Sequence, residues 1–356
     1  MKPEIDGTLS GAAGAKVTAV GLGMLAALLA IGSGCRPAPS AQVVVYTSVD
    51  DVFSRPVAER FQQETGIRVR LVPDTEETKS TGLVNRLIAE KDRPVADVFW
   101  SGDPVRAALL KAKGVTAAYH SPQAQGLPAL YSDPEGHWTG FSARARVLIY
   151  NTGLVKKGAE PRSVLDLVTP RFKGKACIAN PLFGTTSMHA AALFQVLGEE
   201  KARRFFEDFT ANGGAILSSN GEVRRRVAAG DFAVGITDTD DAHVALTEGK
   251  PVGVVYPDQD GMGTLIIPNA AVLIQGGPNP AGGRKFVDYL LRPETERALA
   301  ESEAAQMPVR PSVPVPAGVR PLSEIVPMKV DYSLLAVKLE ELSRGFLKQW
   351  VDANQP

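Results

Sequence analysis

Residues 43–72 have the sequence VVVYTSVDDVFSRPVAERFQQETGIRVRLV, in which two strand-like runs flank a helical pattern. The run 43–46 is continuously apolar, which is typical of a strand buried on both faces. Apolar residues then recur at helical spacing over 52–64, and Gly66 follows where a helix would end in a left-handed turn. The run 67–72 alternates like a half-exposed strand. The stretch therefore predicts a β-α-β unit with parallel strands.

The same alternation continues along the rest of the chain. Apolar runs predict further strands at 96–100, 145–150, 175–179, 232–236 and 264–274. Helical spacing predicts helices at 79–91, 103–114, 186–198, 200–212, 221–230 and 281–291, and one long amphipathic helical region at 331–351. This order predicts an α/β protein of two lobes, each a mainly parallel sheet flanked by helices, with a ligand cleft between them.

We expect residues 43–142 to form the first part of lobe 1 and residues 143–265 to form lobe 2. Residues 266–356 are expected to return to lobe 1 and to finish as C-terminal helices. The 356 residues, 44% of them hydrophobic, suffice for two such units around full cores. Lys and Arg number 39, as do Asp and Glu, so the net charge is zero and a nucleic-acid partner is not expected.

The first residues have the pattern of an export signal. Lys16 precedes an apolar run at 17–31, which is short for a transmembrane helix, and the sequence Gly-Ser-Gly-Cys ends at Cys35. Small residues before a Cys indicate a lipoprotein signal peptide at 1–35, with lipid on Cys35 and a tether at 36–42. A plain secretory signal or a short anchor is the alternative. Cys177 would then be the one cysteine of the mature chain, in a strand-like run typical of a small buried residue.

Three carboxylates follow a predicted strand in the stretch Gly235–Ala242, GITDTDDA. Asp238, Asp240 and Asp241 are thereby expected beyond the carboxyl end of that strand, where ligands of open α/β sheets bind. Capping of the following helix is the alternative, although one cap needs only one Asp. We therefore predict an acidic site on a protein of zero net charge.

Four segments resemble family 1 extracellular solute-binding proteins of ABC importers, and within them the periplasmic ferric-ion-binding branch. The segments are residues 43–72, PVADVFWSGDP (94–104), FSARARVLIYNTGLV (141–155) and GGRKFVDYLLRPETERALAE (282–301). The resemblance implies a type II periplasmic-binding-protein fold that closes over its ligand, in a monomer outside the cytoplasmic membrane. It also implies an ABC permease and its ATPase as partners, with membrane contact only through the N-terminal lipid.

The resemblance also places a metal site. Asp50, beside Asp51, occupies the position of a family His, with capping of the following helix as the alternative for both acids. The family Glu matches Gly102 or Asp103, of which only Asp103 could be a ligand. Thr239 and Asp240 stand where ferric proteins carry a pair of Tyr. The chain thus keeps the location of the metal site without its phenolates. The metal ligands that we expect are Asp50, Asp103, Asp238, Asp240 and Asp241.

Further residues are expected to contact the ligand. Thr185, Thr186 and Ser187 begin a helix, where free N–H groups and hydroxyls favour an anion, and the resemblance places a helper anion there beside Asn220. Arg144 and Arg146 either add positive charge or form the solvent face of their strand. The remaining expected ligand contacts are Ser48, Glu76, Glu77 and Thr239, with helix-terminal acids as the alternative for the two Glu.

Binding is favoured over catalysis by this sequence. Ser48, Ser101 and Ser187 lack the flanking glycines of a nucleophile elbow, and the four His show no metal or triad spacing. Carboxylates are hard oxygen ligands, so the expected cargo is iron(III) or another hard metal ion, held with a helper anion or without one. A polyamine or an oxyanion such as a phosphonate is the alternative cargo. No catalytic cofactor is expected.

Overall fold

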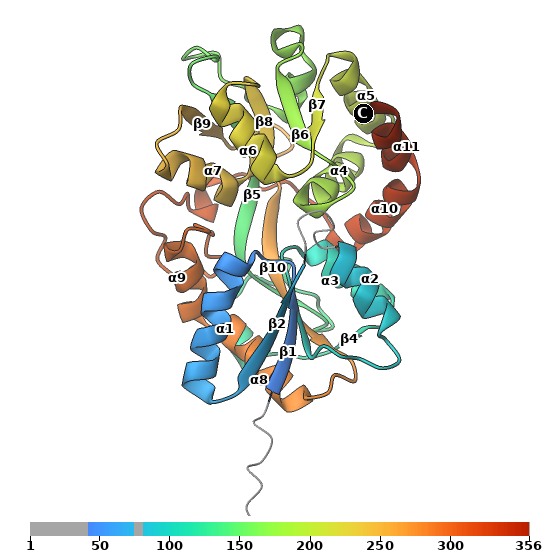
Figure 1. Cartoon of the computed structure of the whole chain (residues 1–356), viewed down its shortest axis with the longest axis vertical. Helices are drawn as coiled ribbons and strands as arrows, with labels where there is room; N and C mark the ends of the chain where they lie inside the picture. The colour runs from blue at the N-terminus through green and yellow to red at the C-terminus, as the bar shows by residue number, and fades with distance from the viewer. Residues whose placement is uncertain (1–41, 75–80, 356) are drawn as a thin grey trace, which may run out of the picture. The chain divides into compact units, whose positions relative to one another are not determined.

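The computed structural model describes residues 42–74 and 81–355, in which strands alternate with helices (Figure 1). The strands are β1 (Gln42–Thr47), β2 (Arg68–Pro73), β3 (Val98–Ser101), β4 (Thr116–Ala117), β5 (Thr139–Asn151), β6 (Ala176–Ala179), β7 (Ala215–Leu217), β8 (Val234–Asp238), β9 (Val252–Val255) and β10 (Ile266–Ile274). Gln42, expected to end the tether, is therefore the first residue of β1. Cys177 is buried in β6, as predicted.

Each predicted helix has a counterpart in the structure within a few residues, and α9 (Pro293–Glu301) is a helix that was not predicted. They are α1 (Asp51–Thr65), α2 (Thr81–Ala89), α3 (Pro104–Ala112), α4 (Gly184–Leu197), α5 (Glu199–Ala211), α6 (Asn220–Ala229), α7 (Thr239–Thr247), α8 (Pro280–Leu290), α9 (Pro293–Glu301), α10 (Tyr332–Arg344) and α11 (Phe346–Asn354). Gly66 ends α1 in the left-handed conformation, with φ of 70°, as the sequence predicted. None of the helices within 42–74 and 81–355 is long and apolar enough to cross a membrane.

One mixed sheet joins the strands in the order β2-β1-β3-β10-β5-β8-β6-β7, with β4 beside β10 and β9 beside β5. β1 is parallel to β2 and β3, and β6 is parallel to β7 and β8. β5 and β10 are antiparallel to each other and to their outer neighbours β8 and β3. Each lobe therefore has a parallel group of strands, and β5 and β10 cross between the two groups (Figure 1).

The C-terminal helices pack along both lobes. α10 contacts α3 and α4, and α11 contacts α5, where the rings of Phe206 and Trp350 lie 5.2 Å apart. The prediction of one helical region over 331–351 is wrong in one respect, because Gly345 separates α10 from α11. A Cβ at residue 345 would lie 3.1 Å from Glu341 O, so the close backbone approach at this junction favours glycine.

A buried polar cluster lies beside the paired strands β5 and β10 that connect the two lobes. Ser142 N donates to Glu296 Oε1 at 2.8 Å, and Asn269 Nδ2 donates to Ser142 O and to Gln306 Oε1, both at 2.7 Å. A bulge interrupts the β5–β10 pairing between Pro268 and Asn269, and Ser142 has a φ of 37°. Side chains thus replace the ladder hydrogen bonds that the bulge removes, since buried backbone groups need partners.

We predict that Glu296→Ala lowers the free energy of unfolding by about 3 kcal/mol. The substitution removes the acceptor of Ser142 N and Val309 N and leaves Arg310 buried beside a missing carboxylate. Glu294→Ala, on the exposed side of the same helix, is the matched control and should change stability little. Urea unfolding of both variants measures the difference, and equal stabilities would contradict the prediction.

Candidate ligand-binding pocket

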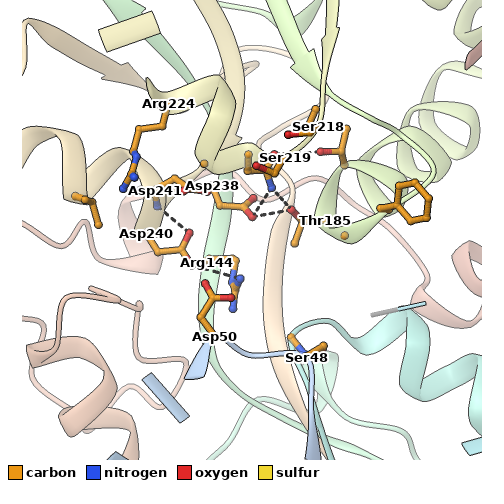
Figure 2. Close-up of a pocket in the computed structure, with 18 of the residues that line it drawn as sticks. Ser48, Asp50, Arg144, Thr185, Ser218, Ser219, Arg224, Asp238, Asp240 and Asp241 are labelled. Atoms are coloured by element: carbon orange, nitrogen blue, oxygen red, sulfur yellow. Dashed lines mark hydrogen bonds and ion pairs between the residues drawn. The ribbon is translucent and has the colours of Figure 1, made fainter. Parts of the chain in front are cut away.

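A pocket of about 560 Å³ lies where the parallel strands of both lobes end (Figure 2). Its lining follows the last residues of β1, β3, β6, β7 and β8 and includes the first turns of the helices that succeed them. Parallel strands pass into their helices at one edge of a sheet, so these helix N-termini gather there. The lining residues are Ser48, Asp50, Val52, Phe53, Gly102, Asp103, Arg144, Ala179, Asn180, Phe183, Gly184, Thr185, Thr186, Ser218, Ser219, Asn220, Gly221, Arg224, Arg225, Asp238, Asp240, Asp241, Val244 and Glu303.

The three carboxylates after β8 lie together in this pocket. Asp238, Asp240 and Asp241 each offer an oxygen, and these oxygens lie within 4.8 Å of one another. Asp238 and Asp240 are buried, and Asp241 is half-buried. Asp238 occupies the N-cap position of α7, yet its side chain makes no capping hydrogen bond. Capping therefore does not explain the cluster, whose spacing suits oxygen ligands around one hard cation.

Arg146 of β5 is fully buried behind the pocket and holds part of its wall. Its Nη1 lies 2.7 Å from Asp238 Oδ1, 3.0 Å from Thr185 Oγ1 and 3.2 Å from Asn220 Oδ1. Its Nη2 donates to Thr186 Oγ1 at 3.2 Å. Thr185 Oγ1 and Asn220 Nδ2 also donate to Asp238 Oδ2, at 2.6 and 3.1 Å. Both oxygens of Asp238 thus accept hydrogen bonds from the protein.

Arg144, two residues earlier on β5, lies beside Asp240. Its Nη1 is 3.3 Å from Asp240 Oδ2, and both side chains are buried. Burial raises the pKa of the Asp240 carboxyl, and the charge of Arg144 counteracts part of that rise. Burial is the largest single influence on Arg144 and opposes its charge, but the combined attraction of Asp240, Asp238, Asp50 and Asp241 outweighs it, so the pKa of the guanidinium is raised. The reading of Arg144 and Arg146 as a solvent face is therefore wrong, because β8, β9 and β10 flank β5 and helices cover it.

Lobe 1 contributes the residues that follow β1 and β3. Ser48 Oγ accepts a hydrogen bond from Gly102 N at 2.9 Å, which joins the two loops. Asp103 Oδ1 caps α3 by accepting from Arg106 N at 2.9 Å. Asp50 precedes α1 without a side-chain capping bond, and Figure 2 shows it directed toward the middle of the pocket. Of the acids predicted for lobe 1, Asp50 and Asp103 line the pocket, and Asp103 also caps α3.

Two predicted ligand contacts point elsewhere. Ser187 Oγ accepts from Arg106 Nη2 at 2.8 Å and donates to Gly184 O at 2.6 Å. Thr239 Oγ1 accepts from Ala145 N at 3.2 Å. Neither residue lines the pocket. The structure thus gives both hydroxyls a supporting role, since each satisfies a buried donor behind the lining.

Several polar lining residues were not predicted from the sequence. Ser219, Asn220 and Glu222 form a helix-start pattern that marks the N-terminus of α6, and Ser219 Oγ accepts from Glu222 N at 3.2 Å. That signal was sufficient to place Ser218 and Ser219 near the pocket. No local pattern identifies Glu303. The missed polar residues are Asn180, Ser218, Ser219, Arg224, Arg225 and Glu303.

Other predictions fall on residues that the structure does not describe. These are the signal peptide at 1–35, the lipidated Cys35, the tether up to residue 41, and the expected ligand contacts Glu76 and Glu77. They stay predictions.

Two lobes that meet over a polar pocket at their strand ends form the kind of cleft in which proteins bind small ligands. The sequence model described as "Bacterial extracellular solute-binding protein" matches residues 93–329, and the chain belongs to this family. Proteins of this family work with ABC transporter permeases. The resemblance found in the sequence is thereby confirmed.

Individual relatives differ in the solutes that their names record. The chain is 27% identical over 300 residues to "Iron uptake protein A1" of Synechocystis sp., a match covering 81% of each chain. It is 29% identical over 310 residues to a "Putative 2-aminoethylphosphonate-binding periplasmic protein" of Salmonella typhimurium, covering 82% of this chain and 86% of that one. The structure of iron-bound HitA from Pseudomonas aeruginosa is similar with a TM-score of 0.77 at 22% identity, covering 85% and 98%. This last likeness confirms the predicted type II fold.

We predict that His189 makes stability depend on pH just below neutrality. Burial, and secondly the charge of Arg146, lowers the pKa of His189 well below its ordinary value of about 6.5. The unfolded chain therefore binds a proton below about pH 6.5 that the folded chain does not, and the free energy of unfolding falls as pH falls. His189→Gln should remove up to about 1.4 kcal/mol per pH unit of this slope. Urea unfolding at pH 5.5 and 7.5 measures it, and His243→Gln is the control that should keep the slope.

Proposed function

We propose that this protein captures a hard metal ion, iron(III) foremost, together with an oxyanion and delivers it to an ABC permease. The observation that carries this proposal is the group of three carboxylates, Asp238, Asp240 and Asp241, with oxygens within 4.8 Å of one another. Asp50 and Asp103 line the same pocket from lobe 1, so a cargo that fills the pocket can contact both lobes. A ligand that binds both lobes favours their closed arrangement, because it gains contacts only there.

In this proposal the oxyanion binds at the N-termini of α4 and α6. Thr185 and Thr186 stand in the first turn of α4, and Ser219 and Asn220 begin α6. The first N–H groups of a helix lack intrahelical partners and attract oxyanions. An anion bound there also offsets the charge of a trivalent ion, which carboxylates without phenolates stabilise less completely.

The relatives support this cargo and this cellular role. The similar Synechocystis protein is named for iron uptake. We infer that the chain works outside the cytoplasmic membrane, held by lipid on Cys35, as a monomer that is not an enzyme. Its partners would be the permease and its ATPase, with no nucleic acid involved.

Asp240→Asn should weaken metal binding by about tenfold or more, which corresponds to about 1.4 kcal/mol. The change keeps the shape of the side chain and removes the charge that attracts the ion. Titration of the metal-stripped protein with ferric citrate, followed by calorimetry, measures the affinity. Asp260→Asn, exposed and outside the pocket, is the control. Equal affinities of the two variants would refute a carboxylate-built metal site.

An oxyanion such as an organophosphonate is the second candidate cargo. Arg144, Arg224 and Arg225 line the pocket beside the N-termini of α4 and α6, a combination suited to a phosphonate group. A 29% identical relative is named for 2-aminoethylphosphonate, whose amino group would face Asp240 or Asp241. A polyamine is the cargo that these arginines disfavour, because like charges repel.

Arg224→Gln separates the two candidates. If the cargo is a phosphonate, the variant should bind 2-aminoethylphosphonate about tenfold more weakly, since it loses a charge-assisted contact. If the cargo is a metal ion, the affinity of the variant for that ion should equal or exceed that of the wild type. Arg226→Gln is the matched control, because Arg226 lies on the same helix, is paired with Asp231 and does not line the pocket.

A further inference from the structure

Arg144 differs from its neighbour Arg146 in how its donors are used. Arg146 makes hydrogen bonds to four side chains of the pocket wall, and its guanidinium does not line the pocket. Arg144 is 7% exposed and lines the pocket, and its Nε has no hydrogen-bond partner among the described residues. Its one short charged contact there is the ion pair with Asp240 at 3.3 Å. Nε is shielded from solvent, so the two Nη groups are the donors that a hydrogen-bond-accepting ligand in the pocket can reach.

The position of Arg144 places its charge between the lobes. Nη1 faces Asp240 of lobe 2, while Gly102 of lobe 1 lies on the other side, where a Cβ at residue 102 would be 3.8 Å from Nη2. Figure 2 shows the guanidinium between Asp240 and Asp50. Asp238 and Asp241 attract it as well. The acidic cluster therefore already contains one fixed positive charge at its centre.

We propose that Arg144 is the built-in counter-ion of the acidic cluster and restricts the pocket to cargos that carry an oxyanion group. A bare cation would be repelled by the guanidinium of Arg144, which is fixed on β5 and keeps its proton. An oxyanion instead accepts hydrogen bonds from the guanidinium and from the N-termini of α4 and α6. The oxyanion thereby competes with Asp240 for the guanidinium of Arg144. The Asp240 carboxylate can then bind a metal ion or an ammonium group. This inference rests on the proposed function, because it names the form in which the cargo is bound.

The test compares Arg144→Met, which removes the charge, with Arg144→Lys, which keeps it, and with Arg226→Met as the control. Each mature, metal-stripped protein is heated with Mn²⁺ chloride, spermidine, inorganic phosphate, 2-aminoethylphosphonate or ferric citrate. A ligand that binds only the folded state raises Tm by mass action. Calorimetry then gives Kd for each probe that raises Tm.

We expect the wild type to respond to an oxyanion-bearing probe and not to Mn²⁺ or spermidine. Arg144→Met should bind the oxyanion probe at least about tenfold more weakly and should gain a Tm response to Mn²⁺, because Asp240 loses its counter-ion. Arg144→Lys and Arg226→Met should reject Mn²⁺ like the wild type. A wild type that binds Mn²⁺ without an anion, or an Arg144→Met variant that does not gain Mn²⁺ binding, would overturn the inference.

The inference and the proposed function fail in different ways. If no probe stabilises the wild type, the proposed cargo is wrong, and the gain of Mn²⁺ binding by Arg144→Met still decides the role of Arg144. If Arg144→Met does not fold, Asp240→Asn is the substitute, since it frees Arg144 from its ion pair. Its affinity for inorganic phosphate should then rise by about threefold or more. An unchanged affinity would overturn the inference.

Discussion

The ion pair between Arg146 and Asp238, 2.7 Å long and completely buried, fixes the part of the molecule on which the pocket depends. Arg146 belongs to the crossing strand β5, and Asp238 ends β8. The same guanidinium reaches Thr185 at the start of α4 and Asn220 at the start of α6. The Arg146 guanidinium thus fixes the position of the end of β8 relative to the N-termini of α4 and α6. Removing either partner alone would leave a buried charge without compensation, so the pair behaves as a single structural unit.

This arrangement gives the pocket two signs of charge at close range. The carboxylates after β8 favour cations, and the arginines with the N-termini of α4 and α6 favour anions. A cargo with only one sign leaves the other set of groups poorly compensated. This is the reason for proposing a cargo that combines a cation with an oxyanion, whether as a metal complex or as one zwitterionic molecule. The names of the similar proteins include both an iron-uptake protein and a putative 2-aminoethylphosphonate-binding protein.

Of the two readings that the sequence left open for the arginines of β5, the solvent face fails for an identifiable reason. Alternation along a strand indicates a solvent face only when the strand has one, and β5 has strands on both edges and helices packed over it. Ser187 and Thr239 show the related difficulty for hydroxyls. Both lie in the first turn of a helix at the sheet edge that forms the pocket, yet each hydroxyl accepts from a donor behind the lining. Their positions in the sequence correctly placed both residues at the sheet edge that forms the pocket. The direction of each hydroxyl depended on which hydrogen-bond partner lay nearest in the folded protein.

The sequence by itself determined the alternation of strands and helices, the end of α1 at Gly66, the burial of Cys177 and the acidic residues at successive strand ends. These features follow from local periodicity, glycine conformation and chain order, which act over a few residues. Only the tertiary structure decided that Asp238 pairs with Arg146, 92 residues away, that Asp240 lies beside Arg144, and that Arg224 and Glu303 reach the same pocket. Those contacts depend on how the crossing strands β5 and β10 bring distant segments together. No local sequence pattern predicts these contacts, because the energy of a buried charge depends on which groups surround it in space.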